Sequence, residues 1–300
     1  MSTSRPGPSP RSVVAIGNFD GVHLGHRALL AELFAAAERL EAVPTVYTFH
    51  PAPTAVVAPQ RHQPRLQTLE ARLERLRALG VARVEVETFT AEFAAIPAET
   101  FVRRVLVERL GAKALVVGYD FRFGNMRAGD AAFIRRIAPE LELLEVPAVH
   151  SGGEAVSSSR IRTLVARGQV EAAAVLLGQP WSLSGPVVHG HARGRTIGFP
   201  TANVAQQEEL QPATGVYAVR VGLADGRTLD GVANIGTRPT LGGGARSNEV
   251  HLFDFEGDLY GQSLTVSLIS RLRDEQRFAS VPELVDQIRR DAEAARLILA

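Results

Sequence analysis

Short runs of apolar and β-branched residues alternate with amphipathic helical segments from residue 13 to about residue 150. Strands that alternate with helices predict a parallel sheet, and ligands bind beyond the carboxyl ends of the strands in such sheets. The helical segments place apolar side chains on one face over residues 29–40, 69–79 and 101–110. The expected strands are Val13–Ile16, Val43–Phe49, Val81–Glu85, Ala114–Val117 and Leu141–Val146.

The pattern changes after residue 181, where short alternating segments are separated by Gly, Pro, Asn and Asp. Repeated short strands with turn signals predict an antiparallel barrel or sandwich. The segments are "SGPVVHG", "GVYAVRVGL", "TLDGVANIG", "EVHLFDF" and "LTVSLISRL". Two short helices are expected over residues 157–177, the second ended by Gly178, and a last helix begins near Val281. We therefore place a domain boundary near residues 178–184.

The length of 300 residues also favours two domains, which we assign to residues 13–180 and 181–300. Residues 1–12, "MSTSRPGPSPRS", are polar and rich in Pro and Ser, which is typical of a disordered tail. No apolar run approaches the ~18 residues of a membrane span. The 33 basic and 32 acidic residues give a net charge of +1, which indicates neither nucleic acid nor a membrane surface as a partner. We expect a cytoplasmic protein, and homo-oligomerisation stays open.

The chain contains no cysteine and a single lysine. Cysteine is absent, which excludes disulfides, thiolate metal sites and cysteine nucleophiles. Lys113 is the only lysine, so a Walker A loop, which ends in Gly-Lys, is excluded. Phosphate binding must therefore use arginine, histidine or backbone N–H groups.

The stretch "GNFDGVHLGH", residues 17–26, directly follows the first expected strand. A glycine-rich turn between a strand and a helix presents backbone N–H groups and the positive helix end to an anion. His23 and His26 are one helical turn apart, so both imidazoles are able to face one phosphate. The alternative is a plain turn in which Asp20 caps the helix and the histidines have no chemical role.

Three further segments of the first half carry polar or aromatic side chains: "TFHPAP" at 48–53, "VGYDFRFGNMRAGD" at 117–130 and "SSSRIR" at 157–162. Their arginines match phosphate oxygens bidentately. The alternatives are a turn after a strand, aromatic packing in a core, and a serine that caps a helix.

Together these four segments resemble the nucleotidyltransferase superfamily with its HxGH signature, in the form found in prokaryotic FAD synthetases. The resemblance implies a Rossmann-like domain that transfers AMP from ATP to FMN. The catalytic residues that it implies are His23, His26, Ser158 and Arg162. The FMN-binding residues that it implies are His50, Pro51, Phe121 and Phe123. The ATP-binding residues that it implies are Gly17, Asn18, Phe19, Asp20, Gly21, Gly25, Asp120, Ser157 and Arg160. In a chain almost free of lysine, we expect His23, His26, Arg160 and Arg162 to carry what a lysine carries in related sites.

The second half contains "GHARGRTIGFPTANV" at residues 190–204. Its glycines allow close backbone approach, and its arginines offer donors to an anion. Thr201 and Asn203 supply neutral oxygens on one side of an extended chain, and neutral oxygens with nucleotide phosphates are an acceptable environment for Mg²⁺. The alternative is a glycine-rich hairpin whose Thr and Asn make local turn bonds.

The segment "GRTIGFPTAN" resembles the riboflavin kinases, and "GVYAV", "GVANIGTRPT", "NEVHLFDFEGDLYG" and "RLRDEQRF" follow in the family's order. The resemblance implies an antiparallel Greek-key β-barrel with a terminal helix. It implies that Glu249 is the catalytic base and that Thr201 and Asn203 hold the metal. The kinase ATP-binding residues that it implies are Gly190, Arg193, Gly194, Gly198 and Pro200.

The two resemblances imply a bifunctional enzyme that uses ATP and Mg²⁺ and handles riboflavin, FMN and FAD. One alternative is a nucleotidyltransferase that acts on another phosphate substrate, with the second domain as a passenger. Another is a non-catalytic flavin- or nucleotide-binding regulator. Sequence spacing alone does not bring Glu249 to Thr201 and Asn203, or the two histidines to the two arginines.

Overall fold

The computed structural model describes residues 11–190, 194, 197–205, 209–237 and 246–300. Its contacts form two compact units. The sheet unit runs to Ser157 without Pro64–Gln67, and the barrel unit comprises Pro64–Gln67 and Ser158–Ala300. The contacts thus divide the chain before the boundary expected at residues 180 and 181, which stays a prediction about the functional domains. Most of the expected tail lies outside the described residues, but Ser12 belongs to the first strand, so the tail prediction was wrong there.

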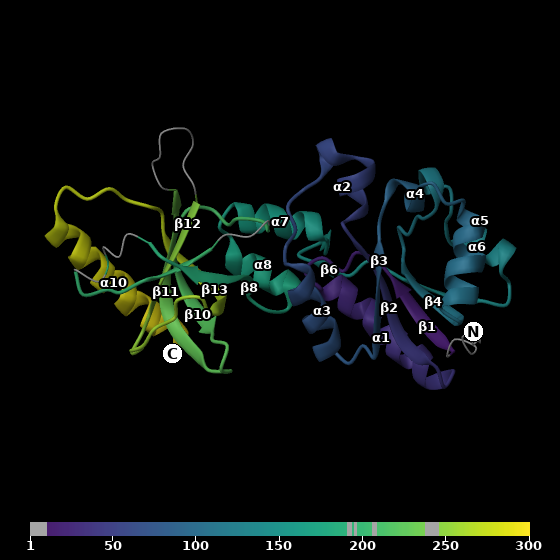
Figure 1. Cartoon of the computed structure of the whole chain (residues 1–300), viewed down its shortest axis with the longest axis horizontal. Helices are drawn as coiled ribbons and strands as arrows, with labels where there is room; N and C mark the ends of the chain where they lie inside the picture. Colours follow the sequence, from purple (N-terminus) through teal and green to yellow (C-terminus); the bar gives the residue numbers. More distant parts are fainter. Residues whose placement is uncertain (1–10, 191–193, 195–196, 206–208, 238–245) are drawn as a thin grey trace, which may run out of the picture. The chain divides into compact units, whose positions relative to one another are not determined.

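The sheet unit is built on a five-stranded parallel sheet with strand order β3-β2-β1-β4-β5 (Figure 1). Its strands are β1 (Ser12–Ile16), β2 (Val43–His50), β3 (Arg83–Thr88), β4 (Ala112–Gly118) and β5 (Glu142–Val146). All five overlap the segments expected from the alternation of apolar runs and helices. The chain runs outward from β1 to β2 and β3, and then crosses back to β4. The gap between the carboxyl ends of β1 and β4 is therefore the topological switch point, where this architecture binds ligands.

Helices cover both faces of this sheet (Figure 1). One core packs α1 (Leu24–Arg39) and α3 (Leu69–Ala78) against β1, β2 and β4. The other packs the π-helical segment η2 (Phe101–Arg109) and α6 (Ala131–Ile137) against the opposite face. The remaining short elements are α2 (Pro53–Val57), η1 (Pro59–Arg61), α4 (Ala91–Ala94), α5 (Ala98–Thr100), η3 (Asn125–Arg127), β6 (His150–Ser151) and β7 (Glu154–Ala155).

The barrel unit contains a closed six-stranded barrel with strand order β10-β11-β12-β9-β8-β13. Its strands are β8 (Trp181–Val188), β9 (Ala202–Val204), β10 (Gly215–Gly222), β11 (Thr228–Thr237), β12 (Arg246–Leu252) and β13 (Ser263–Arg273). Every pairing is antiparallel. The strands β10, β11 and β12 follow one another, and β9 lies beside β12, which is a Greek-key order. The barrel expected from the resemblance is confirmed.

Among its described residues, the barrel unit also contains the helices α7 (Ser158–Ala166), α8 (Val170–Leu177) and α10 (Val281–Leu299). Gly178 ends α8 with a left-handed φ of 68°, as its place in the sequence predicts. On α8, Glu171 accepts hydrogen bonds from the Ser270 hydroxyl at 2.6 Å and the Arg271 backbone N–H at 3.1 Å. These bonds tie α8 to β13.

The short segment Pro64–Gln67 belongs to the barrel unit because it is hydrogen-bonded there. The indole N–H of Trp181 donates to the Leu66 carbonyl at 2.9 Å, and the Leu210 N–H donates to the Arg65 carbonyl at 2.7 Å. Trp181 itself is buried at the start of β8.

Candidate active sites

The turn between β1 and α1 lies at the switch point of the parallel sheet. It carries left-handed backbone at Phe19 (φ 50°), Gly21 (φ 84°) and Val22 (φ 41°). For non-glycine residues such a conformation costs on the order of 1–3 kcal/mol each and persists only where the surroundings fix it. Here Phe19 and Val22 are fully buried in the core, and the Val22 N–H donates to the Phe19 carbonyl at 3.1 Å. Core packing thus holds the turn in an unusual shape.

His23 and His26 lie side by side at the start of α1. Their rings are stacked with centroids 3.7 Å apart and planes 19° apart. His23 is the residue that caps the helix, because its Nδ1 accepts the His26 backbone N–H at 3.4 Å. The alternative in which Asp20 caps this helix was therefore wrong. In a neutral His23 ring this bond leaves the proton on Nε2, as a donor.

The surroundings of His26 set the pKa of its ring. Burial lowers the pKa of His26 well below its usual value of 6.5, and the charges of His23 and Arg72 lower it further. Without a ligand His26 is therefore a neutral hydrogen-bonding group at neutral pH. The expectation that His23, His26, Arg160 and Arg162 together carry what a lysine carries in related sites stays a prediction.

Gly25 allows the close approach of the His23 ring to the helix. A Cβ atom at this position would lie 3.1 Å from His23 Cε1 and 3.6 Å from the Val156 carbonyl oxygen. Because a side chain there would press on the His23 ring, the glycine of the His-x-Gly-His stretch follows from packing at this helix start.

The residues expected to bind FMN lie at the ends of β2 and β4. His50 and Pro51 follow one another where β2 ends, and the peptide bond between them is cis. Phe121 and Phe123 follow β4 and stack with centroids 5.3 Å apart. Phe123 is buried against Phe101, so the reading as core packing holds for it, whereas Phe121 is only partly buried.

In the segment "SSSRIR", Ser157 is the last residue of the sheet unit, and residues 158–162 form the first turns of α7 in the barrel unit. Ile161 is fully buried, so α7 packs through this face, while Arg160 and Arg162 are partly exposed. The Arg162 Nε donates to the Pro64 carbonyl at 2.9 Å. The convergence of Ser158, Arg160 and Arg162 with the two histidines stays a prediction.

The barrel brings together residues that lie far apart in the sequence. In the register of β9, β12 and β11, Glu249 is paired with Asn203 on one side and with Asn234 on the other. Paired residues of antiparallel strands leave the same face of a sheet, and Thr201 lies two residues before Asn203 on that face. The grouping of Glu249 with Thr201 and Asn203, which sequence spacing left open, is therefore a property of the barrel.

A cavity of about 380 Å³ lies between this face and α10. Its apolar lining includes Ile197, Phe199, Val216, Val232, Phe278, Leu284 and Ile288. Its polar lining includes Thr201, Asn234, Glu249, His251, Arg273, Glu275, Gln276 and Asp291. A smaller cavity of about 90 Å³ is lined by Pro200, Phe255, Asp258 and Tyr260 among others. Thr201 lines both cavities.

Two glycines of the segment at residues 190–204 pack against its polar residues Thr201 and Asn203. A Cβ atom on Gly190 would lie 2.3 Å from Asn203 Nδ2, so only glycine leaves room for this amide. A Cβ atom on Gly194 would lie 2.2 Å from the Phe199 carbonyl oxygen and 3.4 Å from Thr201 Oγ1. Gly198 has a left-handed φ of 87°. Arg193 lies outside the described residues.

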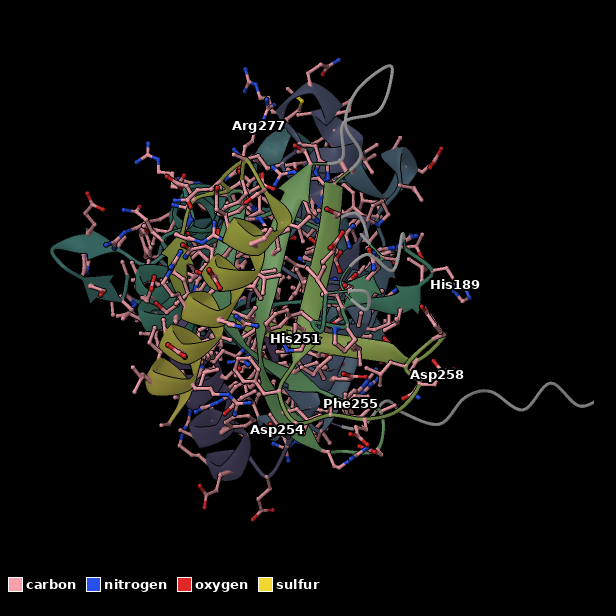
Figure 2. All side chains as sticks on the ribbon, turned by 90° about the vertical axis from the view of Figure 1, so that its left-hand side faces the viewer. His189, His251, Asp254, Phe255, Asp258 and Arg277 are labelled. Carbon is pink, nitrogen blue, oxygen red and sulfur yellow. The ribbon has the colours of Figure 1, made fainter. Side chains whose placement is uncertain are left out.

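His251 is hydrogen-bonded to the backbone of Pro200 in the same segment. Its Nδ1 lies 2.8 Å from the Pro200 carbonyl oxygen and therefore donates to it, immediately before Thr201. Figure 2 shows His251 among the barrel strands, with Asp254, Phe255 and Asp258 on the loop that leaves β12. The sequence reasoning missed His251, although it lies two residues after Glu249 and so on the same face of its strand.

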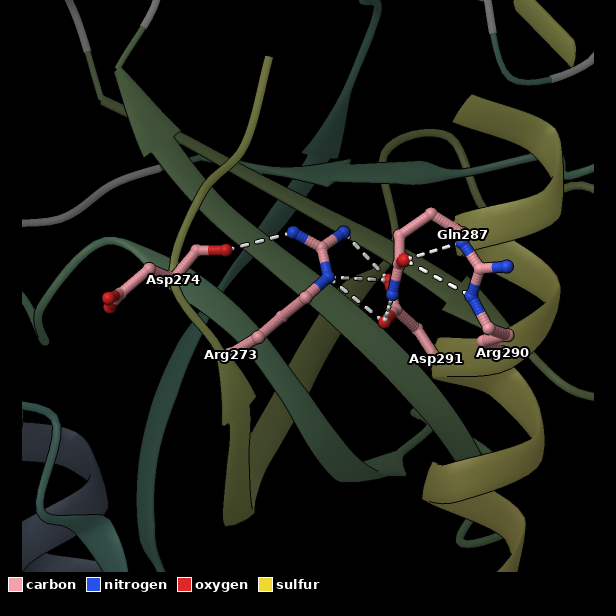
Figure 3. Close-up of polar contacts among 5 residues, drawn as sticks. All are labelled: Arg273, Asp274, Gln287, Arg290 and Asp291. Carbon is pink, nitrogen blue, oxygen red and sulfur yellow. Dashed lines mark hydrogen bonds and ion pairs between the residues drawn. The ribbon is translucent and has the colours of Figure 1, made fainter. Parts of the chain in front are cut away.

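An ion pair forms the polar wall of the cavity at α10. Arg273 at the end of β13 donates from Nε and Nη2 to the Asp291 carboxylate at 2.7–3.0 Å, and Gln287 donates to the same carboxylate at 2.8 Å (Figure 3). Both ionic side chains are largely buried. This pair and Asn234 were also missed, because only strand register and helix packing bring them to Glu249.

Comparisons with known proteins match both halves of the chain. A family model described as FAD synthetase matches residues 6–160, and one described as riboflavin kinase matches residues 177–299. The bifunctional riboflavin kinase/FMN adenylyltransferase of Escherichia coli strain K12 is 44% identical over 96% of this chain and 93% of its own length. The protein of the same description from Pseudomonas fluorescens is 41% identical over 98% and 95%.

A solved structure described as a macrolide-efflux protein from Streptococcus pneumoniae has a TM-score of 0.88 and 34% identity, over 98% of this chain and 95% of that chain. Within the described part of the present chain, no helix is both long and apolar enough to cross a membrane. The two family models and the curated relatives span nearly the whole sequence. The chain therefore belongs to the bifunctional riboflavin kinase/FMN adenylyltransferase family.

Proposed function

We propose that this protein makes FAD from riboflavin in two ATP-dependent reactions. The barrel unit transfers the γ-phosphoryl group of ATP to riboflavin, which gives FMN and ADP. The sheet unit supplies the two histidines for transfer of AMP from a second ATP to FMN, which gives FAD and pyrophosphate. The observation that carries the proposal is the row Asn203, Glu249 and Asn234 across three paired strands, because it places a carboxylate between two amide side chains. Glu249 and Asn234 of this row also line the cavity, together with Thr201.

In the kinase reaction, Glu249 is the general base. Its carboxylate accepts the proton of the terminal ribityl hydroxyl as that oxygen attacks the γ-phosphorus and the bond to the ADP oxygen breaks. The apolar walls formed by Val216, Val232 and Phe278 suit a flat aromatic ring, and the cavity of about 380 Å³ lies within the usual range of small-molecule sites. The flavin ring would lie between the barrel and α10, with its side chain toward Glu249.

The donor atoms near Glu249 fit Mg²⁺. Thr201 and Asn203 offer neutral oxygens, and this ion normally takes its remaining ligands from water and nucleotide phosphates. Among the residues that the structure describes, no three or more His, Asp or Glu side chains are grouped so that they could hold a metal ion by themselves. Mg²⁺ does not need such a group, because it usually keeps several water ligands. When bound, the ion would neutralise charge on the transferred phosphoryl group. Thr201 and Asn203 would orient it, with Gly190 and His251 fixing their places.

In the adenylyl transfer, an FMN phosphate oxygen attacks the α-phosphorus of ATP and the bond to pyrophosphate breaks. This phosphate is already an anion, so the reaction needs in-line placement and charge stabilisation rather than a strong base. His23 and His26 would donate N–H groups to phosphate oxygens, while Arg160 and Arg162 would supply positive charge and Ser158 a further donor. Asp120 and Phe121 would border the nucleotide and the flavin.

The test is to incubate the purified protein with riboflavin, ATP and Mg²⁺ and to separate the flavins by chromatography. FMN followed by FAD supports both halves. FMN alone would refute the adenylyltransferase half, and unchanged riboflavin together with tight flavin binding would indicate a binding protein without turnover. Supplying FMN directly tests the second reaction alone. The expectation that neither nucleic acid nor a membrane is a partner stays a prediction, as does a cytoplasmic location.

A further inference from the structure

Arg72 is a buried charged residue that neither proposed reaction uses. It lies on α3, whose only two buried residues are Arg72 and Leu76, one helical turn apart on the face toward the sheet. The Arg72 residue is 4% exposed. A guanidinium in such a place is costly unless hydrogen bonds compensate for the lost water. The hydrogen bonds of Arg72 therefore indicate which segments it holds in place.

The two ends of the guanidinium reach two different segments. Nη1 donates to the carbonyl of Asn18, in the turn after β1, and Nη2 donates to the carbonyl of Phe49 at 3.1 Å. The Asn18 carbonyl also accepts the Thr48 hydroxyl at 3.3 Å. Arg72 thus joins the carboxyl ends of two neighbouring strands, β1 and β2, from a third element.

In the proposed reaction these two segments lead to the binding residues of two different substrates, ATP and FMN. The turn with Asn18 leads into His23 and His26, and Phe49 directly precedes His50 and Pro51, the expected FMN segment. The planar guanidinium has a fixed spacing between its N–H groups, so it sets the distance between the two carbonyls. Adenylyl transfer requires the FMN phosphate and the α-phosphorus in line, and misplacement by about 1 Å costs on the order of 10²-fold in rate.

We propose that Arg72 is a positioning residue for adenylyl transfer, which sets the separation of the nucleotide turn and the flavin segment. This inference rests on the proposed adenylyltransferase activity. Arg72 need not touch either substrate, since it acts through the backbone of Asn18 and Phe49. The Arg72 charge also contributes to keeping His26 neutral, which is the form that donates one ring N–H and accepts at the other nitrogen.

The test compares Arg72→Met, Arg72→Lys and the control Arg77→Met, which removes an exposed arginine from the same helix. FAD formation from supplied FMN gives kcat and KM for both substrates, and FMN formation from riboflavin in the same preparation is an internal control. We expect kcat for FAD formation to fall about 10²-fold in Arg72→Met, less in Arg72→Lys, and not at all in Arg77→Met. FMN formation is expected to stay unchanged in all three variants.

The melting temperature separates positioning from plain stability. Methionine replaces a buried charge by an apolar chain of similar length, so Arg72→Met is expected to be at least as stable as Arg72→Lys, which buries an ammonium group. A positioning role thus predicts that the Arg72→Lys variant forms FAD faster than the Arg72→Met variant, although Arg72→Lys is not the more stable of the two. The inference is overturned if turnover follows stability instead, or if folded Arg72→Met makes FAD at the rate of the unaltered protein. An unaltered protein that makes no FAD would refute the proposed function and this inference with it.

Discussion

Asn203 on β9 and Glu249 on β12 are directly paired across two antiparallel strands. This pairing places the proposed base beside a proposed metal ligand. Glu249→Gln keeps the shape of the side chain but removes its ability to accept a proton, so we expect FMN formation to fall about 10²–10⁴-fold. FAD formation from supplied FMN is expected to continue unchanged. Glu256→Gln, at an exposed glutamate of the same unit, is the control, and equal losses in both variants would contradict the assignment.

The contact between Gly190 and Asn203 gives a second prediction. In Gly190→Ala the new Cβ would meet the Asn203 amide at 2.3 Å and displace it, so kinase activity should fall and the Mg²⁺ concentration needed for half-maximal FMN formation should rise. Gly222→Ala is the matched control on β10, because its nearest new contact is an ordinary one of 3.8 Å to Thr265. A magnesium dependence that is unchanged in Gly190→Ala would argue against Asn203 as a metal ligand.

The low pKa of His26 predicts a pH dependence. Between this lowered pKa and the usual value of about 6.5, the unfolded chain binds a proton that the folded unit excludes. The stability that His26 contributes is therefore complete above about pH 6.5 and is lost as the pH falls. The measurement is NMR titration of the ring protons of His26 without ligands. The midpoint is expected below 6.5 and should rise in Arg72→Met, because a positive charge is removed. A midpoint at or above 6.5 would contradict this picture.

The buried pair Arg273–Asp291 leads to a prediction about the free energy of unfolding of the barrel unit. Arg273→Met leaves the Asp291 carboxylate in the wall of the cavity without its main partner, and such a change costs about 3–5 kcal/mol. The double variant Arg273→Met with Asp291→Leu removes both charges and should recover much of that loss. Calorimetric unfolding of the two variants checks the prediction. If the double variant is no more stable than the single one, the ion pair itself is the source of stability.

Local sequence patterns predicted the elements of this fold well. The buried run Val13–Ile16 became β1 with one residue added, and the strand and turn signals after residue 181 became a closed barrel. These features depend on periodicity and turn residues, which act over short distances along the chain. The helix α10 follows the same rule, but Leu284 and Ile288 on its apolar face are only partly buried, because they line the cavity.

The assembly of the sites was beyond sequence reasoning for a physical reason. Glu249 meets Asn203 through barrel closure, which fixes register between strands that are distant in sequence. The neutral state of His26 results from burial and from the charge of Arg72 on another helix, and neither is visible in the spacing of two histidines. The burial of Arg72 is likewise not visible in the helical pattern of residues 69–79.

Trp181 is the chain's only tryptophan, and its indole is buried with its N–H bonded to the Leu66 carbonyl. Indole emission shifts to longer wavelength when water reaches the ring. When the protein is excited at a wavelength that tyrosine does not absorb, its fluorescence therefore comes from one known place, in the barrel unit. Unfolding of that unit can be followed optically without any added dye, and comparison with circular dichroism, which registers helices of both units, shows whether the two units unfold together.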